Sequence, residues 1–233
     1  MSQKPDADFK RRQQEATAAI NQADRAAHAI NPKRDRFFET VYENADGDAA
    51  HVPWADLDAK PELKQWLAGN PGRGRSAVDV GCGLGDNAEY MSAGGWQTLG
   101  FDFSPKAIGW AKQRFAGSGV DYRIGDLFKL PAEWMGAFDL VHECYTLQSI
   151  PPDTLDQTIP AVCSLVAPGG TLLVYTRLRA DGSKVDGPPW PLEKSAANRF
   201  ADHGMSLVDE KPFVIAKGDR KIEHVFSVWE KKA

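Results

Sequence analysis

The feature that most constrains the fold of this chain is a glycine-rich segment that directly follows a short apolar run. The segment Asp79-Val80-Gly81-Cys82-Gly83-Leu84-Gly85 comes after Ser76, Ala77 and Val78. Glycines in such a turn let a ligand approach the backbone closely, and a helix that begins after them points its amide groups at that ligand. The pattern predicts a nucleotide-type crevice at the carboxyl edge of a parallel sheet.

Strand-like and helix-like runs alternate after residue 75. We expect strands at 76–80, 97–101, 120–124, 138–142, 170–175, 206–208 and 223–229, with helices at 86–92, 105–115, 154–165 and 192–203. Lys217-Gly218-Asp219-Arg220 is expected to turn between the last two strands. Alternation of this kind is typical of βαβ units stacked on a parallel sheet, so the fold class is α/β.

Acidic residues stand where two of these strands end. Asp102 ends the second strand, where a carboxylate can accept both hydroxyls of a ribose. Asp126 follows the third strand with Leu127 and Phe128 beside it, and this group offers an acceptor for the amino group of adenine and apolar walls for its faces. The glycine loop and these two acids together predict ligand binding over a purely structural turn.

The residue after the glycine loop bears on which ligand binds. Dinucleotide dehydrogenases favour a Gly-x-Gly-x-x-Gly pattern, whereas Asp86 follows Gly85 here and places a carboxylate at the helix start. That charge would repel a pyrophosphate and favours a cationic or zwitterionic ligand. A dinucleotide-dependent oxidoreductase is kept as an alternative.

As a set, these motifs resemble those of class I S-adenosylmethionine-dependent methyltransferases, including Ala167-Pro168-Gly169-Gly170 before the fifth strand. The resemblance implies a Rossmann-like, seven-stranded, mostly parallel sheet with helices on both faces, and S-adenosylmethionine as cofactor. The cofactor-binding residues that it implies are Trp54, Asp79, Gly81, Gly83, Gly85, Asp102, Phe103, Asp126, Leu127 and Glu143.

A narrower resemblance is to the thiopurine, thiol and halide methyltransferases. It is carried by Pro53-Trp54, by Leu63-Lys64-Gln65-Trp66-Leu67 and by Gly187-Pro188-Pro189-Trp190-Pro191. It implies methyl transfer to a thiol, a sulfide or a halide. The alternatives are methylation of oxygen or nitrogen on a larger metabolite, and a regulator that binds the cofactor without catalysis.

The candidate catalytic residues are His142, Tyr145, Arg177 and Trp190, which fall at or after strand ends facing the crevice. Tyr145 is expected to orient the acceptor and Arg177 to hold an anionic one, although a packed phenol and a solvent-exposed guanidinium are the structural alternatives. His142 is interpreted either as a base or as a strand residue whose polar atoms are hydrogen-bonded within the protein. Trp54 is expected to cover the sulfonium, because an aromatic face attracts a cation.

Residues 1–74 precede the sheet and are expected to form a helical and aromatic lid on one compact domain, with the methyltransferase domain at 75–233. Phe9, Ala16, Ile20, Ala23, Ala27 and Ile30 form a weak helical stripe that Asn31-Pro32 would end. Such a helix either covers a ligand site or lies on the surface.

Composition excludes several partners. The net charge of −4 gives no general attraction for a polyanion, no apolar run approaches the ~20 residues of a membrane span, and the N-terminus has no apolar stretch of a secretory signal. Cys82, Cys144 and Cys163 lack metal-site spacing and are expected to be buried thiols. We therefore expect a cytoplasmic monomer or dimer that acts on a small molecule, without a metal, a membrane or a nucleic acid.

Overall fold

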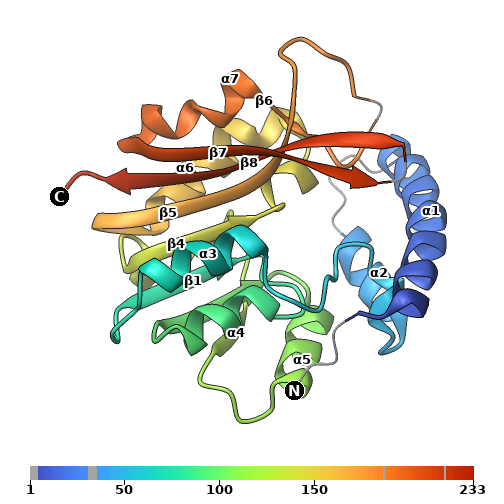
Figure 1. The fold of residues 1–233 in the computed structure, drawn as a ribbon, viewed down its shortest axis with the longest axis horizontal. Helices are drawn as coiled ribbons and strands as arrows, with labels where there is room; N and C mark the ends of the chain where they lie inside the picture. Colours follow the sequence, from blue (N-terminus) through green and yellow to red (C-terminus); the bar gives the residue numbers. More distant parts are fainter. Residues whose placement is uncertain (1–4, 31–35, 186, 218) are drawn as a thin grey trace.

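A central, mostly parallel sheet organises the computed structural model, which describes residues 5–30, 36–185, 187–217 and 219–233 (Figure 1). Its strand order is β3-β2-β1-β4-β5-β8-β7, and the last two strands run antiparallel to their neighbours. The strands are β1 (Ser76–Val80), β2 (Gln97–Asp102), β3 (Asp121–Ile124), β4 (Phe138–Cys144), β5 (Val166–Arg179), β7 (Met205–Lys217) and β8 (Arg220–Lys231). The expected α/β fold with its seven-stranded sheet is confirmed, and a short strand β6 (Leu192–Glu193) pairs with β5 in addition.

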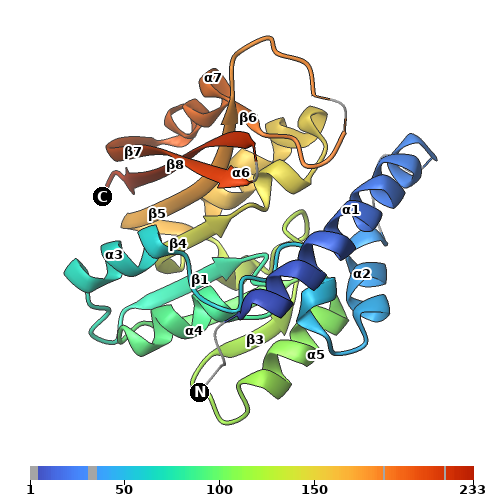
Figure 2. The same ribbon diagram turned by 45° about the vertical axis from the view of Figure 1, so that its right-hand side comes forward.

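Helices cover both faces of the sheet (Figures 1 and 2). One face carries α3 (Pro61–Gly69), α4 (Asp86–Ala93) and α5 (Pro105–Arg114), and the other carries α6 (Leu155–Leu165) and α7 (Lys194–Ala197). Local signals start α5 as expected, since the Ser104 hydroxyl accepts from the Ala107 amide at 3.0 Å and Pro105 occupies the first turn.

Side chains from the two faces of the central strands pack into two separate cores, because successive side chains of a strand point to opposite sides. On β1, Val78 and Val80 pack on the α6 side with Phe101. Ala77 packs on the opposite side with Leu140, against α3 and α4. Burial of these apolar surfaces fixes the strand register, and the register in turn decides which polar side chains reach the carboxyl edge.

Two expectations, about β5 and about the residues that follow it, are wrong. The residues 167–170, expected as a turn, lie inside β5 at a shift in its register with β4, and Gly169 takes a φ of +72° there. The expected helix 192–203 is instead β6, the four-residue α7 and a 3₁₀ segment, Arg199–His203. Pairing with β5 and an ion pair from Arg179 Nη1 to Glu193 Oε1 at 2.8 Å hold residues 192–193 extended.

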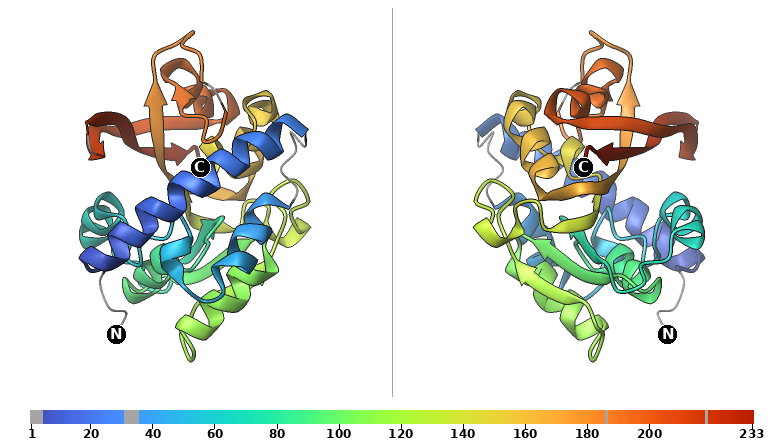
Figure 3. Two further views of the ribbon diagram at one scale, coloured as in Figure 1. Left: turned by 90° about the vertical axis from the view of Figure 1, so that its right-hand side faces the viewer. Right: turned by 90° about the vertical axis from the view of Figure 1, so that its left-hand side faces the viewer.

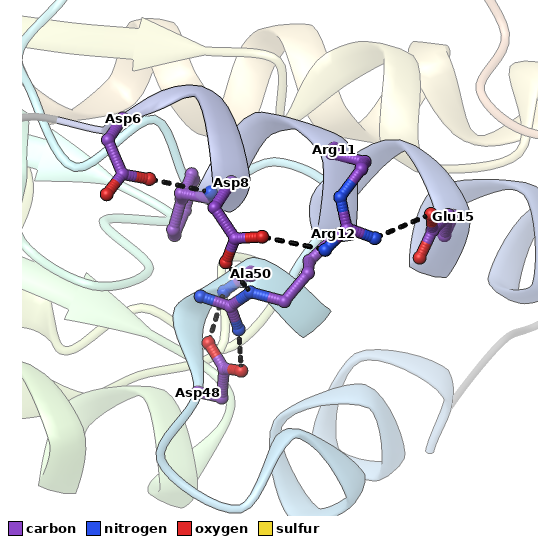
Figure 4. Close-up of polar contacts among 8 residues, drawn as sticks. Asp6, Asp8, Arg11, Arg12, Glu15, Asp48 and Ala50 are labelled. Carbon is purple, nitrogen blue, oxygen red and sulfur yellow. Dashed lines mark hydrogen bonds and ion pairs between the residues drawn. The ribbon is translucent and has the colours of Figure 1, made fainter.

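The N-terminal segment stands at the edge where the parallel strands end (Figure 3, left). It comprises α1 (Ala7–Ile30), α2 (Phe37–Ala45) and a 3₁₀ segment (Ala49–His51). Arg12 on α1 pairs with Asp48, which caps the 3₁₀ segment by accepting from the Ala50 amide at 3.0 Å (Figure 4). The Gln13 amide also donates to the Ala55 carbonyl at 2.7 Å.

Part of the expected stripe on α1 lies outside the described residues. Asn31-Pro32 is not described, and nothing is described of the Ala27 and Ile30 side chains, whereas Phe9 is buried. Contacts of α1 with the segment 48–55 show that it packs against the rest of the N-terminal segment rather than projecting from it. The reading of residues 1–74 as a lid remains a prediction.

Candidate functional site

The glycine loop leaves β1 in a conformation that side chains would obstruct. Gly81, Gly83 and Gly85 have φ values of +62°, +52° and +90°. A Cβ atom on Gly81 would lie 2.5 Å from the Thr146 hydroxyl oxygen, and one on Gly85 would lie 2.3 Å from the Tyr122 hydroxyl oxygen. The loop therefore requires glycine for its backbone angles and for its close neighbours.

Asp102 is held beside this loop at the end of β2. Its Oδ2 accepts from the Gly83 amide at 3.0 Å, and its Oδ1 accepts from the Ser104 amide at 2.9 Å. Burial raises the pKa of Asp102 to about 6, although both backbone hydrogen bonds act in the opposite direction. The carboxylate thus occupies the position that the sequence assigned to it, fixed against the loop and able to accept further hydrogen bonds.

Glu143, near the end of β4, is a buried carboxyl group with one free oxygen. Its Oε1 accepts from the Leu147 amide at 3.0 Å, while Oε2 is buried and has no hydrogen-bond partner among the described residues. Burial raises the pKa of Glu143 to about 8. A cationic group placed against Oε2 would restore the ionised form.

Asp79 and His142 form a buried pair behind the loop. They stand side by side in the register of β1 and β4, with His142 Nδ1 2.7 Å from Asp79 Oδ1. His142 is fully buried, and its Nε2 and Asp79 Oδ2 have no partner among the described residues. This placement favours a role for His142 in holding Asp79 over direct contact with an acceptor.

The residues assigned to adenine lie along the ends of β2 and β3. Leu127 is buried, Asp126 Oδ1 accepts from the Phe128 amide at 2.9 Å, and Phe103 is 41% exposed. The Phe103 ring meets Phe38 of α2 edge-on at 6.1 Å between centroids. These residues offer an apolar surface next to a carboxylate, and their contact with adenine stays a prediction.

Trp54 is joined to the glycine loop through Tyr42 of α2. The Trp54 indole donates to the Tyr42 hydroxyl at 2.7 Å, and that hydroxyl lies 3.2 Å from where a Cβ of Gly83 would stand. The Trp54 ring also packs edge-on against Phe38 at 5.4 Å. The structure therefore brings Trp54 close to the glycine loop from the N-terminal segment.

A further contact joins α2 to the end of β2, and no sequence motif indicates it. The Ser104 hydroxyl, which caps α5, also donates to Glu39 of α2. Glu39 is an unremarkable helix-face acid in the sequence, and only the fold places it beside the end of β2.

A second cluster lies where β4 and β5 end, on the α3 side of the sheet. The Tyr145 hydroxyl is 2.9 Å from His224 Nε2, and Lys60 Nζ lies 4.5 Å from the centre of the Tyr145 ring. Arg177 on β5 pairs in register with His224 on β8, and its guanidinium carbon is 5.4 Å from the Tyr145 ring centre. The sequence indicated Tyr145 and Arg177 but missed His224 and Lys60, because neither lies in a motif.

Trp190 is buried in the segment between β5 and β6. Its amide donates to the Gln148 carbonyl at 2.7 Å, and Gln148 Oε1 accepts from the Arg177 amide at 2.8 Å. Trp190 therefore belongs to the neighbourhood of Arg177 but lies 8% exposed. Its direct contact with an acceptor stays a prediction.

Asp86, expected to repel a pyrophosphate, is paired with an arginine of the next helix. Asp86 makes two contacts with Arg114 of α5, at 2.9 and 2.7 Å, so its charge is neutralised locally. Its carboxylate is therefore a poor reason to exclude a pyrophosphate, and the choice of ligand depends on the residues described above.

Neither a metal centre nor a membrane span is found in the part of the chain that the structure describes. No group of three or more His, Cys, Asp or Glu side chains there could hold a metal ion. None of the helices described is long and apolar enough to cross a bilayer. Cys82 and Cys163 are buried and Cys144 is half-buried, and all three are free thiols.

Comparison of the sequence identifies relatives of the central region. A family model described as a methyltransferase domain matches residues 77–170. A ubiquinone biosynthesis O-methyltransferase of Aromatoleum aromaticum is 34% identical over 144 residues, which cover 60% of this chain and 60% of that protein. The chain thus matches well under two thirds of the length of this curated relative.

Comparison of the structure extends the similarity beyond that region. The 1,6-didemethyltoxoflavin-N1-methyltransferase of Burkholderia thailandensis, solved with its substrate and S-adenosylhomocysteine, aligns with a TM-score of 0.67 at 16% identity, covering 88% of this chain and 90% of that one. The magnesium protoporphyrin IX methyltransferase of Synechocystis, solved with S-adenosylmethionine, aligns with a TM-score of 0.58 at 16% identity, covering 85% and 83%. At these identities the alignments show a shared fold.

Proposed function

We propose that this chain, which carries a methyltransferase domain and has the fold of class I S-adenosylmethionine-dependent methyltransferases, transfers a methyl group to an oxygen atom of a small molecule. The observation that carries the proposal is the pair of unpartnered, buried carboxylate oxygens, Asp79 Oδ2 and Glu143 Oε2, beside the glycine loop. Buried acceptors without donors carry a free-energy cost that a cationic ligand removes.

The site residues fit the different parts of S-adenosylmethionine. The free Oε2 of Glu143 suits its ammonium group, Asp102 suits the ribose hydroxyls, and Leu127 and Phe103 suit the adenine faces. The glycine loop allows the ligand to lie against the backbone, because Cβ atoms would fill that space. When bound, S-adenosylmethionine supplies a methyl group on a sulfonium, from which a nucleophile in line can displace it.

The acceptor atom is proposed from the relatives. The ubiquinone biosynthesis enzyme is named for methylation of oxygen, and this favours the oxygen or nitrogen alternative over the thiol, sulfide or halide acceptor that the narrower resemblance implies. Trp66 of α3, which carried part of that resemblance, is half-buried and packs against Trp96 at 6.4 Å between ring centres. We therefore propose oxygen as the acceptor atom, in preference to a thiol, a sulfide or a halide.

The chain's own residues would contribute mainly by position. In-line displacement requires the acceptor atom about 3 to 3.5 Å from the methyl carbon, and holding it there supplies most of the acceleration. We propose that α1, α2 and Trp54 limit the access of water to this point, and that Tyr145, Arg177 and Trp190 form the acceptor side. A cytoplasmic location and a small-molecule acceptor are part of this proposal.

A methyl-transfer assay tests the proposal. Purified protein is incubated with methyl-labelled S-adenosylmethionine and, in turn, with catechol, protocatechuate, an aryl amine, thiophenol or iodide. Label transferred to a hydroxyl compound supports the proposal. Label transferred only to thiophenol or iodide contradicts it and favours a thiol or halide acceptor. Binding of the cofactor without transfer to any acceptor favours a non-catalytic regulator.

A further inference from the structure

We propose that Tyr145 and His224 form a proton-transfer pair for the acceptor, and that Arg177 and Lys60 stabilise the oxygen anion which this transfer creates. The inference rests on the methyl transfer proposed above and narrows its acceptor to a hydroxyl compound that reacts as its anion, such as a phenol. Neither His224 nor Lys60 lies in a sequence motif.

The direction of the hydrogen bonds defines the state of His224. Its Nδ1 lies 2.8 Å from the Ile222 carbonyl oxygen, which only accepts, so Nδ1 carries the proton. In the neutral ring Nε2 is then an acceptor, and the Tyr145 hydroxyl donates to it at 2.9 Å. The Tyr145 oxygen also accepts from the Tyr175 hydroxyl, and its second lone pair remains for a proton from another group.

Tyr145 has an unusual backbone conformation. Its φ is +66°, a left-handed conformation that bulky residues rarely adopt. The conformation is held by its amide, which donates to the Tyr175 carbonyl at 3.0 Å, and by its carbonyl, which accepts from the Ser149 hydroxyl at 2.7 Å. Backbone strain of this kind concentrates at functional sites. Tyr145 is also only half-buried, whereas His224 behind it is 2% exposed.

Two cations face the Tyr145 ring. Lys60 Nζ lies 4.5 Å from its centre, and the guanidinium carbon of Arg177 lies 5.4 Å from it. Arg177 Nε is buried and has no hydrogen-bond partner among the described residues, so a donor is available at this position. Lys60 is paired with Asp56, which leaves Arg177 as the main candidate to meet an anion.

The surroundings of His224 favour its neutral form, which can accept a proton. Burial lowers its pKa below the ordinary value of 6.5, and the Ile222 carbonyl opposes this only in part. Phe213 of β7 stacks on the ring at 5.3 Å. The titratable or charged groups that face it from the packed elements are Tyr145, Tyr175, Arg177 and Lys60.

The step balances on these atoms. The acceptor O–H bond breaks and its proton moves to the Tyr145 oxygen, while the proton of Tyr145 moves to His224 Nε2. The acceptor oxygen keeps the electron pair and forms the bond to the methyl carbon as the carbon–sulfur bond of the donor breaks. His224, protonated on both nitrogens, then returns its extra proton to solvent.

Two variants separate proton transfer from packing. His224→Gln places an amide oxygen that can accept from Tyr145 but cannot take its proton, and Tyr145→Phe removes the hydroxyl. Each variant is expected to lower kcat for protocatechuate by about a hundredfold, with KM little changed. The wild-type pH profile should show an acidic limb below the ordinary histidine range, and His224→Gln should lose it. His203→Gln, at the end of the 3₁₀ segment on the opposite face, is the matched control and should behave as wild type.

A second readout needs no turnover. Protein loaded with S-adenosylhomocysteine is mixed with para-nitrophenol at a pH where the free probe is mostly protonated. The bound probe should show the phenolate absorbance, with a phenolate-to-phenol ratio at least about tenfold above that of the free probe. This gain should fall in His224→Gln and in Arg177→Met, while the affinity for S-adenosylhomocysteine stays unchanged.

The outcomes are distinct. Full turnover by His224→Gln, or a wild-type protein that binds S-adenosylhomocysteine but leaves the bound probe protonated or unbound, overturns the proton-transfer pair and leaves the methyltransferase proposal standing. Failure of the wild type to bind S-adenosylhomocysteine removes the proposed function, and the pair falls with it.

Discussion

His142 Nδ1 lies 2.7 Å from Asp79 Oδ1, and both side chains are buried where β1 and β4 run in register. The contact explains why a histidine stands at this point of a core strand. Asp79 keeps its second oxygen free beside the glycine loop, while the first is fixed by the ring. The pair thus positions from behind a carboxylate that we propose binds the cofactor.

The first prediction removes this support. His142→Ala leaves Asp79 buried without its partner and should lower the free energy of unfolding by about 3 to 5 kcal/mol. His142→Asn, whose amide can still donate to Asp79, should lose less and retain most methyl transfer. Thermal unfolding and turnover measure both effects, with the exposed His51→Ala as control. Near-complete loss of turnover in a stable His142→Asn would instead assign His142 to catalysis.

The second prediction concerns the pH dependence of stability. The folded pKa of Glu143 is raised to about 8 from an ordinary 4.5, so the folded state holds the proton more tightly than the unfolded chain. Its contribution to stability is complete below about 4.5 and is lost as the pH rises to about 8. Glu143→Gln should flatten this decline in the free energy of unfolding, measured by denaturant titration at several pH values. Asp102, raised to about 6, should leave a smaller decline at lower pH. An unchanged profile in Glu143→Gln would show that Glu143 ionises normally.

The third prediction tests the acid at the end of β2. Asp102→Ala removes the acceptor of the Gly83 and Ser104 amides and the proposed ribose contact. Hydrogen bonds to a charged group contribute about 1.5 to 3 kcal/mol, so the Kd for S-adenosylhomocysteine should rise roughly tenfold to a hundredfold. The exposed Asp121, which pairs with Arg123 at the start of β3, is the control for losing one acid. Equal affinity in Asp102→Ala and wild type would remove Asp102 from the site.

The fourth prediction separates the charge of the cofactor from its shape. If the Trp54 ring covers the sulfonium, Trp54→Leu should weaken S-adenosylmethionine more than the uncharged S-adenosylhomocysteine. A cation over an aromatic face contributes about 0.5 to 2 kcal/mol, which corresponds to roughly a twofold to thirtyfold change in the ratio of the two Kd values. Calorimetry with both ligands gives the ratio, and Trp66→Leu, on α3 and packed against Trp96, should leave it constant. A constant ratio in Trp54→Leu would place the sulfonium elsewhere.

The sequence predicted the parts of the fold that depend on local signals. Apolar runs, glycines and the Ser104-Pro105 cap placed the main strands of the parallel sheet, the glycine loop and α5, because each depends on neighbours in the chain. Residues 192–203 were misassigned, since the pairing of Leu192 with Leu178 overrides their helical pattern. Long-range pairing of this kind leaves no local signal.

Some residues of the candidate site could likewise be predicted from local sequence patterns, and others could not. Asp79, Asp102 and Glu143 follow strand patterns and could be assigned from the sequence. Lys60 and His224 could not, because they come from a loop and from an antiparallel strand that meet Tyr145 only in the folded chain. The effect of Asp86 on the ligand could not be predicted either, because its partner Arg114 lies on a different helix and meets it only in the folded chain.

We propose that the glycine loop, Asp102 and the free oxygens of Asp79 and Glu143 form a site for S-adenosylmethionine. Isothermal titration of the wild-type protein with S-adenosylhomocysteine, and separately with NAD⁺, tests it most directly. We predict saturable binding of one S-adenosylhomocysteine per chain with a rise in Tm, and no heat with NAD⁺. Saturable binding of NAD⁺ without any response to S-adenosylhomocysteine would contradict the account and favour a dinucleotide-dependent enzyme.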